Sequence, residues 1–249
     1  MQRGWAWLTE GLQLWRRNPT ALIFASFTYL LALLILSSIP LLGQAAASLI
    51  MPVLSLGVMN TCRAVDEGTK PAPNLLVAGF KSRMLPSLIT IGGLYLVGTV
   101  IVLFAISLFD GGTLMGLMLG TLTLDPEQPI PGLRTSLLLG LALSTPLLMA
   151  YWFAPILAGW WHLSAPKAMF FSLYAVAQNW RAFVAYGFAL FFFIGLVPSF
   201  FIAAVSMLTP VLSTLLLLVL PVVVVPVTFA SFYLNIRDVF GTETNDRLL

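Results

Sequence analysis

The longest uncharged stretches of this chain constrain its fold more than any other feature. No charged side chain occurs between Thr20 and Thr61, or between Ala182 and Ile236. In a helix the first stretch would be about 63 Å long, which is enough for two crossings of a hydrocarbon core of about 30 Å. Because backbone polar groups in lipid must bond within their own segment, such runs are expected to be helical. The sequence therefore predicts an all-α polytopic membrane protein.

Composition supports this class. Of the 249 residues, 59% are hydrophobic and 8% are charged, and the mean hydropathy is +0.99. A soluble domain carries about 25% charged residues, so most of this surface is expected to face hydrocarbon. The basic residues are scattered singly or in pairs at the ends of apolar runs and form no basic face, which argues against nucleic-acid binding.

Proline and glycine divide the apolar runs into six transmembrane helices within a single transmembrane domain, residues 1–249. The first two helices are separated at Ile39–Gly43. The loop Asp110–Arg134 is the longest, and its apolar middle is too short to cross, so we expect that middle to lie on the outer interface. The predicted spans cover about residues 20–39, 44–61, 86–108, 135–158, 182–205 and 211–236.

Two arginines before the first span also raise the question of a cleavable signal peptide. Ala45–Ala47 resembles a small-residue cleavage site. The apolar run Thr20–Ile39, however, is longer than the ~7–15 residues of a signal sequence. We expect the segment to be retained as a span.

The segment Gly4–Asn18 is predicted to form an amphipathic helix before the first span. Its apolar residues recur at spacings of three and four, as on one face of an α-helix, and its arginines lie off that face. Such a helix suits the plane of a membrane interface, with indole rings at headgroup depth. The apolar stripe consists of Trp5, Leu8, Leu12 and Trp15.

Two later segments show a related pattern. One begins at Asn74, which is predicted to cap a short helix, and the other follows Ser164. Their apolar stripes are predicted to be Leu76, Phe80 and Met84 in the first, and Met169, Leu173, Val176 and Trp180 in the second. We expect both to be interfacial amphipathic helices.

Tryptophan and basic residues beside the spans are the predicted contacts with lipid headgroups. Tryptophan is enriched at membrane interfaces, and each basic residue near an anionic leaflet contributes about 1 kcal/mol. A passive anchor without lipid selectivity is the alternative interpretation. The predicted contact residues are Trp5, Trp15, Arg16, Arg17, Lys81, Arg83, Trp160, Trp161, Lys167, Trp180 and Arg181.

The positions of the basic residues predict the orientation. With six spans, all lysines and arginines except Arg134 fall on the side of the two termini. Asp110, Asp125 and Glu127 fall on the side of Arg134. Because cytoplasmic loops carry the excess of basic residues, both termini are predicted to be cytoplasmic.

The order of segments is open to two interpretations. Residues 3–65, 70–162 and 166–238 each read as an amphipathic segment, a span, an outer connection and a second span. This predicts a three-fold repeat of helical hairpins with parallel copies, since two spans preserve the orientation. The alternative is that any protein built from such hairpins has this pattern through its topology alone.

Residues with chemical reactivity are few. No span contains an ionisable side chain, although enzymes and ion-coupled transporters in lipid usually retain one. His162 and Cys62 are the single histidine and the single cysteine, and no metal-ligand spacing or phosphate-binding loop occurs. We therefore expect a protein that is not an enzyme and binds no cofactor or metal.

Prolines in the second, fourth and sixth spans favour a different function. Each frees a carbonyl group and permits a kink, and broken helices in matched positions mark substrate paths in some transporters. The prolines are Pro52, Pro146, Pro155, Pro221 and Pro226.

Three motifs carry a family resemblance. They are the GW…G..L..RNP pattern of Gly4–Pro19, the IPLLG turn at Ile39–Gly43, and Pro52–Gly57 followed by Cys62, Arg63 and Ala64. The chain resembles a family of uncharacterised bacterial inner-membrane proteins, and this resemblance implies six spans without implying an activity, a cofactor or functional residues. More distantly, the layout is similar to the membrane domain fused to some glycerophosphodiester phosphodiesterases.

Two functions from different classes are thus predicted. The first is a non-catalytic integral protein of the bacterial inner membrane that engages lipid or a membrane partner, either another membrane protein or a second copy of the chain. The alternative is a transporter or channel for an apolar or lipid-like solute.

Overall fold

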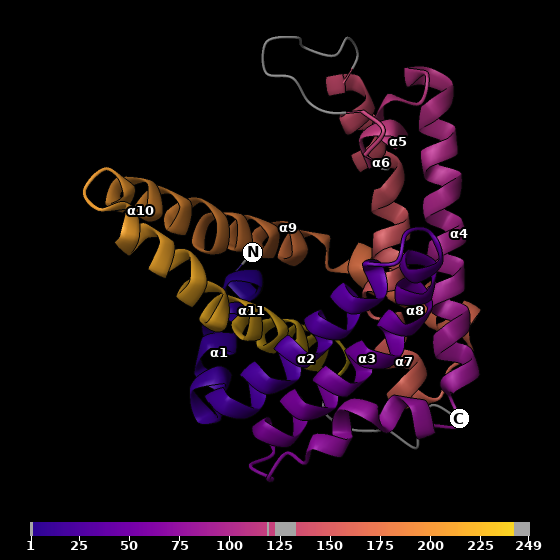
Figure 1. The fold of residues 1–249 in the computed structure, drawn as a ribbon. Helices are drawn as coiled ribbons and strands as arrows, with labels where there is room; N and C mark the ends of the chain where they lie inside the picture. The colour runs from indigo at the N-terminus through magenta and orange to yellow at the C-terminus, as the bar shows by residue number, and fades with distance from the viewer. Residues whose placement is uncertain (1, 119, 123–132, 242–249) are drawn as a thin grey trace.

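The computed structural model describes residues 2–118, 120–122 and 133–241, and over these residues it is helical without any strand (Figure 1). The element η1 is a 3₁₀-helix and η2 is a π-helix. In chain order the elements are α1 (Gln2–Arg17), α2 (Pro19–Ser37), α3 (Leu42–Asp66), η1 (Pro73–Lys81), α4 (Leu85–Asp110), α5 (Thr113–Met118), α6 (Leu133–Trp152), α7 (Ala154–Trp161), α8 (Ala165–Gln178), α9 (Trp180–Leu190), η2 (Phe191–Leu196), α10 (Val197–Ser206) and α11 (Pro210–Phe240).

Six helical segments of the described residues are long and apolar enough to cross a membrane, and each coincides with one predicted span. The prediction of an all-α polytopic membrane protein is confirmed. The fourth crossing consists of α6 and α7, and the fifth consists of α9, η2 and α10. Asp125 and Glu127, which were predicted in the outer loop, lie outside the described residues.

The first two breaks between helices follow from local chemistry. Asn18 caps α2 by accepting a hydrogen bond from the backbone N–H of Ala21 at 3.2 Å, and Pro19 takes the first helical position, where its missing N–H costs nothing. Pro40 lies between α2 and α3, and Leu41 turns the chain with a positive φ of 60°. The predicted break at Ile39–Gly43 is therefore present.

The fourth crossing coincides with the predicted span, but its helix is interrupted between α6 and α7. The hydroxyl of Ser172 on α8 donates to the carbonyl of Met149 at 2.7 Å and accepts from the backbone N–H of Phe153 at 2.8 Å. In an unbroken helix those two backbone groups would bond each other. Pro155, two residues after Phe153, has no backbone N–H to donate. The helix therefore breaks where two hydrogen bonds of the helical pattern are already missing or redirected.

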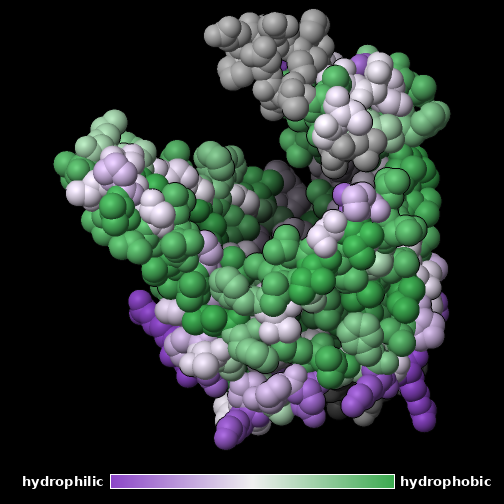
Figure 2. All heavy atoms as spheres, in the orientation of Figure 1, coloured by the Kyte–Doolittle hydropathy of each residue, from purple (hydrophilic) through white to green (hydrophobic). Residues whose placement is uncertain are grey.

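The helices form two arms that diverge from a common base (Figure 1). One arm contains α4, α5 and α6, and the other contains α9, η2, α10 and the first half of α11. Helix α3 lies in the base and packs against α2, α4, η1 and α11. Figure 2 shows apolar surface on both arms, and it shows hydrophilic residues gathered along the base, which we call the charged end.

Helix α1 packs between α9 and α11 of the second arm. A Cβ atom at Gly4 would lie 2.1 Å from the carbonyl oxygen of Ala182, and one at Gly11 would lie 2.7 Å from the backbone nitrogen of Ser231. The two glycines are seven residues apart and so face the same side of the helix. Only glycine permits this close approach of three backbones.

The predicted apolar stripe of α1 is partly wrong. The buried residues are Gly4, Trp7, Leu8, Gly11 and Leu14, and of the predicted stripe only Leu8 is among them. Trp5 is 45% exposed. The stripe was assigned from the helical spacing of apolar residues, but packing against α9 and α11 selects the face that carries the two small glycines.

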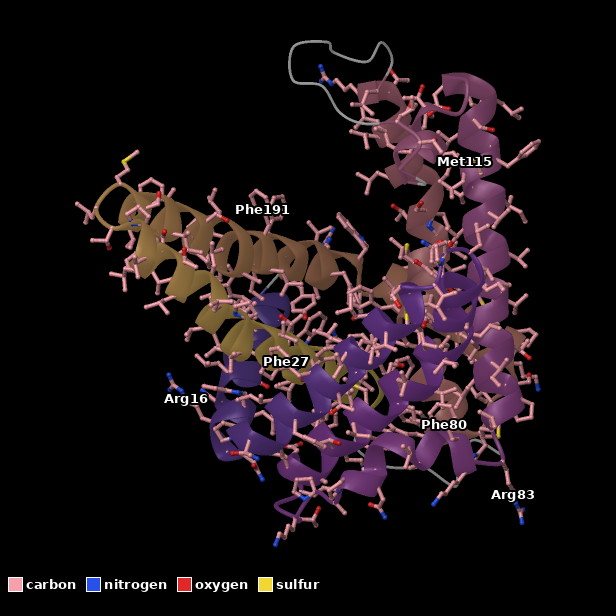
Figure 3. All side chains as sticks on the ribbon, viewed as in Figure 1. Arg16, Phe27, Phe80, Arg83, Met115 and Phe191 are labelled. Carbon is pink, nitrogen blue, oxygen red and sulfur yellow. The ribbon has the colours of Figure 1, made fainter. Side chains whose placement is uncertain are left out.

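The second amphipathic segment also differs from its prediction. It forms the 3₁₀-helix η1, in which Leu76 and Gly79 are buried and Phe80 is exposed (Figure 3). With three residues per turn, positions three apart share a face, so the predicted stripe with a spacing of four does not form. Asn74 lies inside η1, and the predicted cap position is taken by Ala72.

Candidate functional site

A network of ion pairs at the charged end joins three helices that are distant in sequence. Asp66, the last residue of α3, accepts hydrogen bonds from Arg17 Nη1 at 3.1 Å and from Arg237 Nη1 at 2.7 Å. The hydroxyl of Tyr233 donates to the same carboxylate at 3.1 Å. The side chain of Asp66 is only 13% exposed. Asp66 thereby connects α1, α3 and α11.

Two further contacts attach α1 to the end of α11. Arg237 Nη2 bonds Glu10 at 3.4 Å. Asp238 accepts from Arg3 and from the indole N–H of Trp7, the latter at 3.0 Å. These contacts join α1 to the last residues of α11, and α1 in turn packs against α9 of the second arm.

Arg63 occupies a different position, one turn before Asp66. Its Nε donates to Glu67 at 2.8 Å, and its guanidinium lies over the ring of Trp160, 5.3 Å from the centroid. The Trp160 indole N–H in turn donates to Asn60 at 2.8 Å, which fixes the ring. The two Nη atoms of Arg63 make no hydrogen bond to any described residue. They remain available to a ligand.

These side chains line a cavity of about 330 Å³, which we call the arginine–tryptophan cavity. It lies at the charged end, among the last residues of α3, α7 and α11. The lining residues are Arg63, Asp66, Glu67, Trp160, Trp161, Tyr233, Arg237 and Gly241. Two guanidinium groups and two carboxylates face it, so the formal charge of its lining is balanced.

A second cavity, of about 280 Å³, lies between α2, α3 and the segment that leads into η1; we call it the Lys70 groove. Lys70 is its single charged lining residue. Phe24, which is 53% exposed, extends its apolar side along α2. The other lining residues are Asn18, Thr20, Ala21, Ala25, Thr61, Pro71, Ala72, Pro73 and Leu76.

The predicted contact residues of the first amphipathic helix are in different environments. Arg16 is exposed, forms no ion pair with a described residue and points outward in Figure 3. Arg17 bonds Asp66 through its side chain. Trp15 is half-buried, and its indole N–H is buried without a partner among the described residues.

The remaining predicted contacts are spread over the charged end and the start of the second arm. Trp160 and Trp161 line the arginine–tryptophan cavity with their ring centroids 5.9 Å apart. Trp180 is 54% exposed, and the guanidinium of Arg181 lies over its ring. The exposed lysines and arginines that form no ion pair with described residues include Lys81, Arg83 and Lys167. The structure thus brings only the two adjacent tryptophans together in one cavity.

Sequence reasoning did not assign Arg63, Asp66, Glu67, Tyr233 or Arg237 to a site. The ion pairs of Asp66 join residues 49 and 171 positions apart, which no local pattern indicates. One signal was present: Arg63 and Arg237 each follow a proline by eleven residues, Pro52 and Pro226. That spacing agrees with the predicted repeat of hairpins, and it does not by itself indicate a site.

The two singular residues, His162 and Cys62, lie apart from these cavities. Cys62 is fully buried in α3. His162 is exposed and ends α7 in a left-handed conformation with a φ of 55°. Within the described part of the chain, no group of three or more histidine, cysteine, aspartate or glutamate side chains is arranged to hold a metal ion.

Comparison with known proteins identifies a full-length relative. The chain is 36% identical over 248 residues to a probable inner membrane protein of Burkholderia thailandensis, and the match covers 96% of this chain and 92% of that protein. No family model and no solved structure matches. The expected resemblance to inner-membrane proteins is confirmed, whereas the distant similarity to the membrane domain of phosphodiesterases is not shown.

Proposed function

The chain belongs to the family of this Burkholderia thailandensis inner membrane protein, and we propose that it is a non-catalytic multi-pass protein of the inner membrane that binds phospholipid. Membrane lipids are its proposed partners. The observation that carries this proposal is the Lys70 groove, where a single cation meets an apolar surface.

The groove matches the two parts of an anionic phospholipid. Lys70 is exposed, it forms no ion pair with a described residue, and no acidic residue lines the groove. A lipid phosphate at Lys70 would therefore meet no like charge. The exposed ring of Phe24 and the alanines of α2 beside it, Ala21 and Ala25, line the same groove and supply an apolar surface suited to an acyl chain.

The prolines beside Lys70 add to this match. Pro71 and Pro73 restrict the backbone on either side of Ala72. A restricted segment loses less conformational entropy when a ligand binds, so more of the contact energy appears as affinity. Arg16 on α1 supplies a further exposed cation at the same end of the molecule.

Two features support a non-catalytic role. Cys62, the one strong nucleophile, is buried in α3 and has no histidine among its hydrogen-bond partners. The charged residues of the network are engaged mainly with one another, as expected of groups that hold helices together.

Native mass spectrometry of the protein after exchange into vesicles of phosphatidylglycerol tests the proposal. The wild type is expected to retain this anionic lipid, and Lys70→Gln is expected to reduce retention by about three- to tenfold, because a charge-assisted contact to phosphate is lost. Lys81→Gln is the matched control, since Lys81 is also an exposed lysine at the charged end but lies outside the groove. Equal retention by all three proteins would overturn the proposal.

We also propose that both termini are cytoplasmic, on the strength of the basic residues at the charged end. Because native Cys62 is fully buried, single cysteines introduced elsewhere report accessibility. In intact cells, a membrane-impermeant thiol reagent is expected to label Gln44→Cys, at the start of α3, and to spare Lys81→Cys. The opposite labelling pattern would reverse the orientation.

A transporter or channel for an apolar or lipid-like solute is the second candidate. The divergence of the two apolar arms in Figure 2, together with the break between α6 and α7, supports it. In reconstituted vesicles such a transporter would accelerate the transbilayer movement of a fluorescent phospholipid. Movement no faster than in protein-free vesicles would exclude it for that class of solute.

A further inference from the structure

The arginine–tryptophan cavity differs from the Lys70 groove in its charge. Arg63 and Arg237 line it together with Glu67 and Asp66, to which they are ion-paired, so positive and negative groups share the same space. An anion placed there would meet two carboxylates, and a simple cation would meet two guanidinium groups. Like charges at close quarters select against a partner as effectively as favourable contacts select for one. The cavity therefore disfavours ligands of a single charge.

Unused hydrogen-bonding groups in the cavity come in a complementary pair. The two Nη atoms of Arg63 make no hydrogen bond to a described residue, and neither does the second carboxylate oxygen of Glu67. The Nε atom of Arg63 donates to the first carboxylate oxygen of Glu67 at 2.8 Å and so holds the two side chains together. A donor fork suited to phosphate thus lies next to an acceptor suited to ammonium.

Aromatic rings complete the lining. Trp160 and Trp161 lie with their ring planes tilted by 50°, and the Tyr233 ring is 6.4 Å from that of Trp160. The guanidinium of Arg63 occupies one face of Trp160 and shows that this ring already attracts a cation. An alkylammonium group bound beside Glu67 would gain the same kind of attraction from the neighbouring indole.

We propose that this cavity binds a zwitterionic phosphoamine, a ligand that carries a phosphate ester and a primary ammonium a few bonds apart. Arg63 bonds the phosphate, and Glu67 with Trp161 holds the ammonium. The volume of about 330 Å³ lies at the lower end of the ~300–1,000 Å³ range of small-ligand pockets, as expected for a headgroup without its chains.

Two sources supply this chemistry. One is the headgroup of phosphatidylethanolamine, and in that form the inference rests on the proposed phospholipid binding. The other is a free phosphoamine from the aqueous side. The position of the cavity, where α3, α7 and α11 end, is compatible with both.

The first test is lipid retention from vesicles of equal parts phosphatidylethanolamine and phosphatidylglycerol, measured by native mass spectrometry. Glu67→Gln keeps an acceptor for Arg63 but removes the negative charge, and it is expected to lower the retained ratio of phosphatidylethanolamine to phosphatidylglycerol by about tenfold. Arg63→Gln is expected to reduce retention of the zwitterionic lipid. Lys70→Gln is the matched control and is expected to reduce only the anionic lipid.

The second test uses free phosphoethanolamine in isothermal titration calorimetry. Binding by the wild type and not by Glu67→Gln supports the site whatever the lipid result, and it identifies a soluble source if phosphatidylethanolamine is not retained. If the wild type retains no phospholipid of either kind, the proposed function fails while this arm still tests the cavity. The inference is overturned if Glu67→Gln leaves both the lipid ratio and the binding of phosphoethanolamine unchanged.

A folding control separates binding from stability. The Glu67 side chain is 52% exposed, so its conversion to glutamine is expected to leave the thermal unfolding temperature unchanged. A lipid ratio that shifts while the unfolding temperature stays constant supports the site. A lipid ratio that shifts only when Glu67→Gln also lowers the unfolding temperature would show that the variant acts through stability, and this outcome would overturn the inference.

Discussion

Two membrane crossings of this protein differ in a way that hydropathy does not predict. The apolar window of α3 that qualifies it as a crossing has a mean hydropathy of 1.7 and is 44% buried, whereas the window of the crossing Trp180–Ser206 has a mean hydropathy of 2.5 and is 6% buried. In a soluble protein the more apolar helix would lie deeper in the core. In lipid, apolar surface gains nothing from leaving its solvent, so hydrophobicity does not decide which helix is central.

Small residues decide it instead. On α3, Gly57 lets the backbone of η1 approach closely. In a second contact, Gly92 of α4 lets the backbone of α3 approach at Ser48 and Leu49. The crossing formed by α9, η2 and α10 presents large rings in the corresponding place, among them the exposed Phe191 in Figure 3. Close backbone approach yields dispersion contacts that lipid tails cannot match, and protruding phenylalanines prevent that approach.

Hydroxyl groups follow the same division. Near the base, Tyr186 bonds Ser231 on another helix at 2.6 Å, and Ser172 bridges the backbone of the fourth crossing. Ser206, at the far end of the second arm, bonds only Ala203 of its own helix. Among the described residues, polar bonds between helices therefore connect the base, and none is found in the outer part of the second arm.

The largest expected effect comes from filling the close approach on α3. A Cβ at Gly57 would lie 2.4 Å from the carbonyl oxygen of Leu76, so Gly57→Ala must displace η1 and is expected to lower the free energy of unfolding by about 3 kcal/mol. Gly195→Ala is the matched change on the second arm, where nothing lies within 4 Å. Equilibrium unfolding in mixed micelles compares them, and equal losses would break the distinction between the two crossings.

Truncation of large side chains is expected to have the next largest effect. Met59 on α3 is fully buried, and Met59→Ala is expected to cost about 2 kcal/mol, mainly through the cavity that it leaves. Phe200 on α10 is 76% exposed, so Phe200→Ala should change stability by less than about 0.5 kcal/mol, since lipid replaces the lost contacts. The same unfolding measurement applies. A larger loss for Phe200→Ala would indicate that a partner covers the arm.

Loss of the central carboxylate is expected to weaken the attachment of the second arm. Asp66→Asn removes the ion pairs with Arg17 and Arg237, and because both guanidinium groups are partly exposed the cost is expected to be about 1–2 kcal/mol. Hydrogen exchange should increase in α1 and at the end of α11 while α4 keeps its protection. Unchanged exchange in α1 would show that glycine packing alone holds it.

Removal of the hydroxyl at the helix break is expected to have the smallest effect. Ser172→Ala leaves the N–H of Phe153 free to bond Met149 directly, so the net cost is expected to be about 1 kcal/mol. Thr145→Ala is the control, since its hydroxyl bonds only Leu141 of the same helix. Slower exchange at Phe153 in Ser172→Ala would show that the fourth crossing has straightened. Faster exchange there would show that the serine supplies the bond that protects this amide.

Much of the fold was predictable because the membrane restricts the choices. Every crossing was located from an uncharged run bounded by Pro, Gly or a charged residue, since lipid permits only helices that satisfy their own backbone. The faces of those helices were not predictable in the same way. Leu14 is 1% exposed although it lies outside the predicted stripe of α1, because helical spacing alone did not distinguish the stripe from the neighbouring face that packs against α9 and α11.

The candidate sites show the same limit. The predicted contacts Trp160 and Trp161 do line a cavity, since tryptophans beside a span stay near the interface. Their charged companions in that cavity come from α3 and from the end of α11, and the sequence separation of these elements conceals the juxtaposition. The three-fold repeat of hairpins stays a prediction.

The sequence by itself determined that this protein is helical, crosses a membrane six times and places most of its basic residues at one end. Those properties depend on local composition, because the free energy of transferring a segment into lipid is approximately a sum of contributions from its residues. Only the tertiary structure decided that α1 packs between α9 and α11, that Asp66 joins three helices, and that two cavities of different charge lie at the charged end. Those properties depend on which backbones approach one another, and glycine positions and ion pairs between distant residues set that approach.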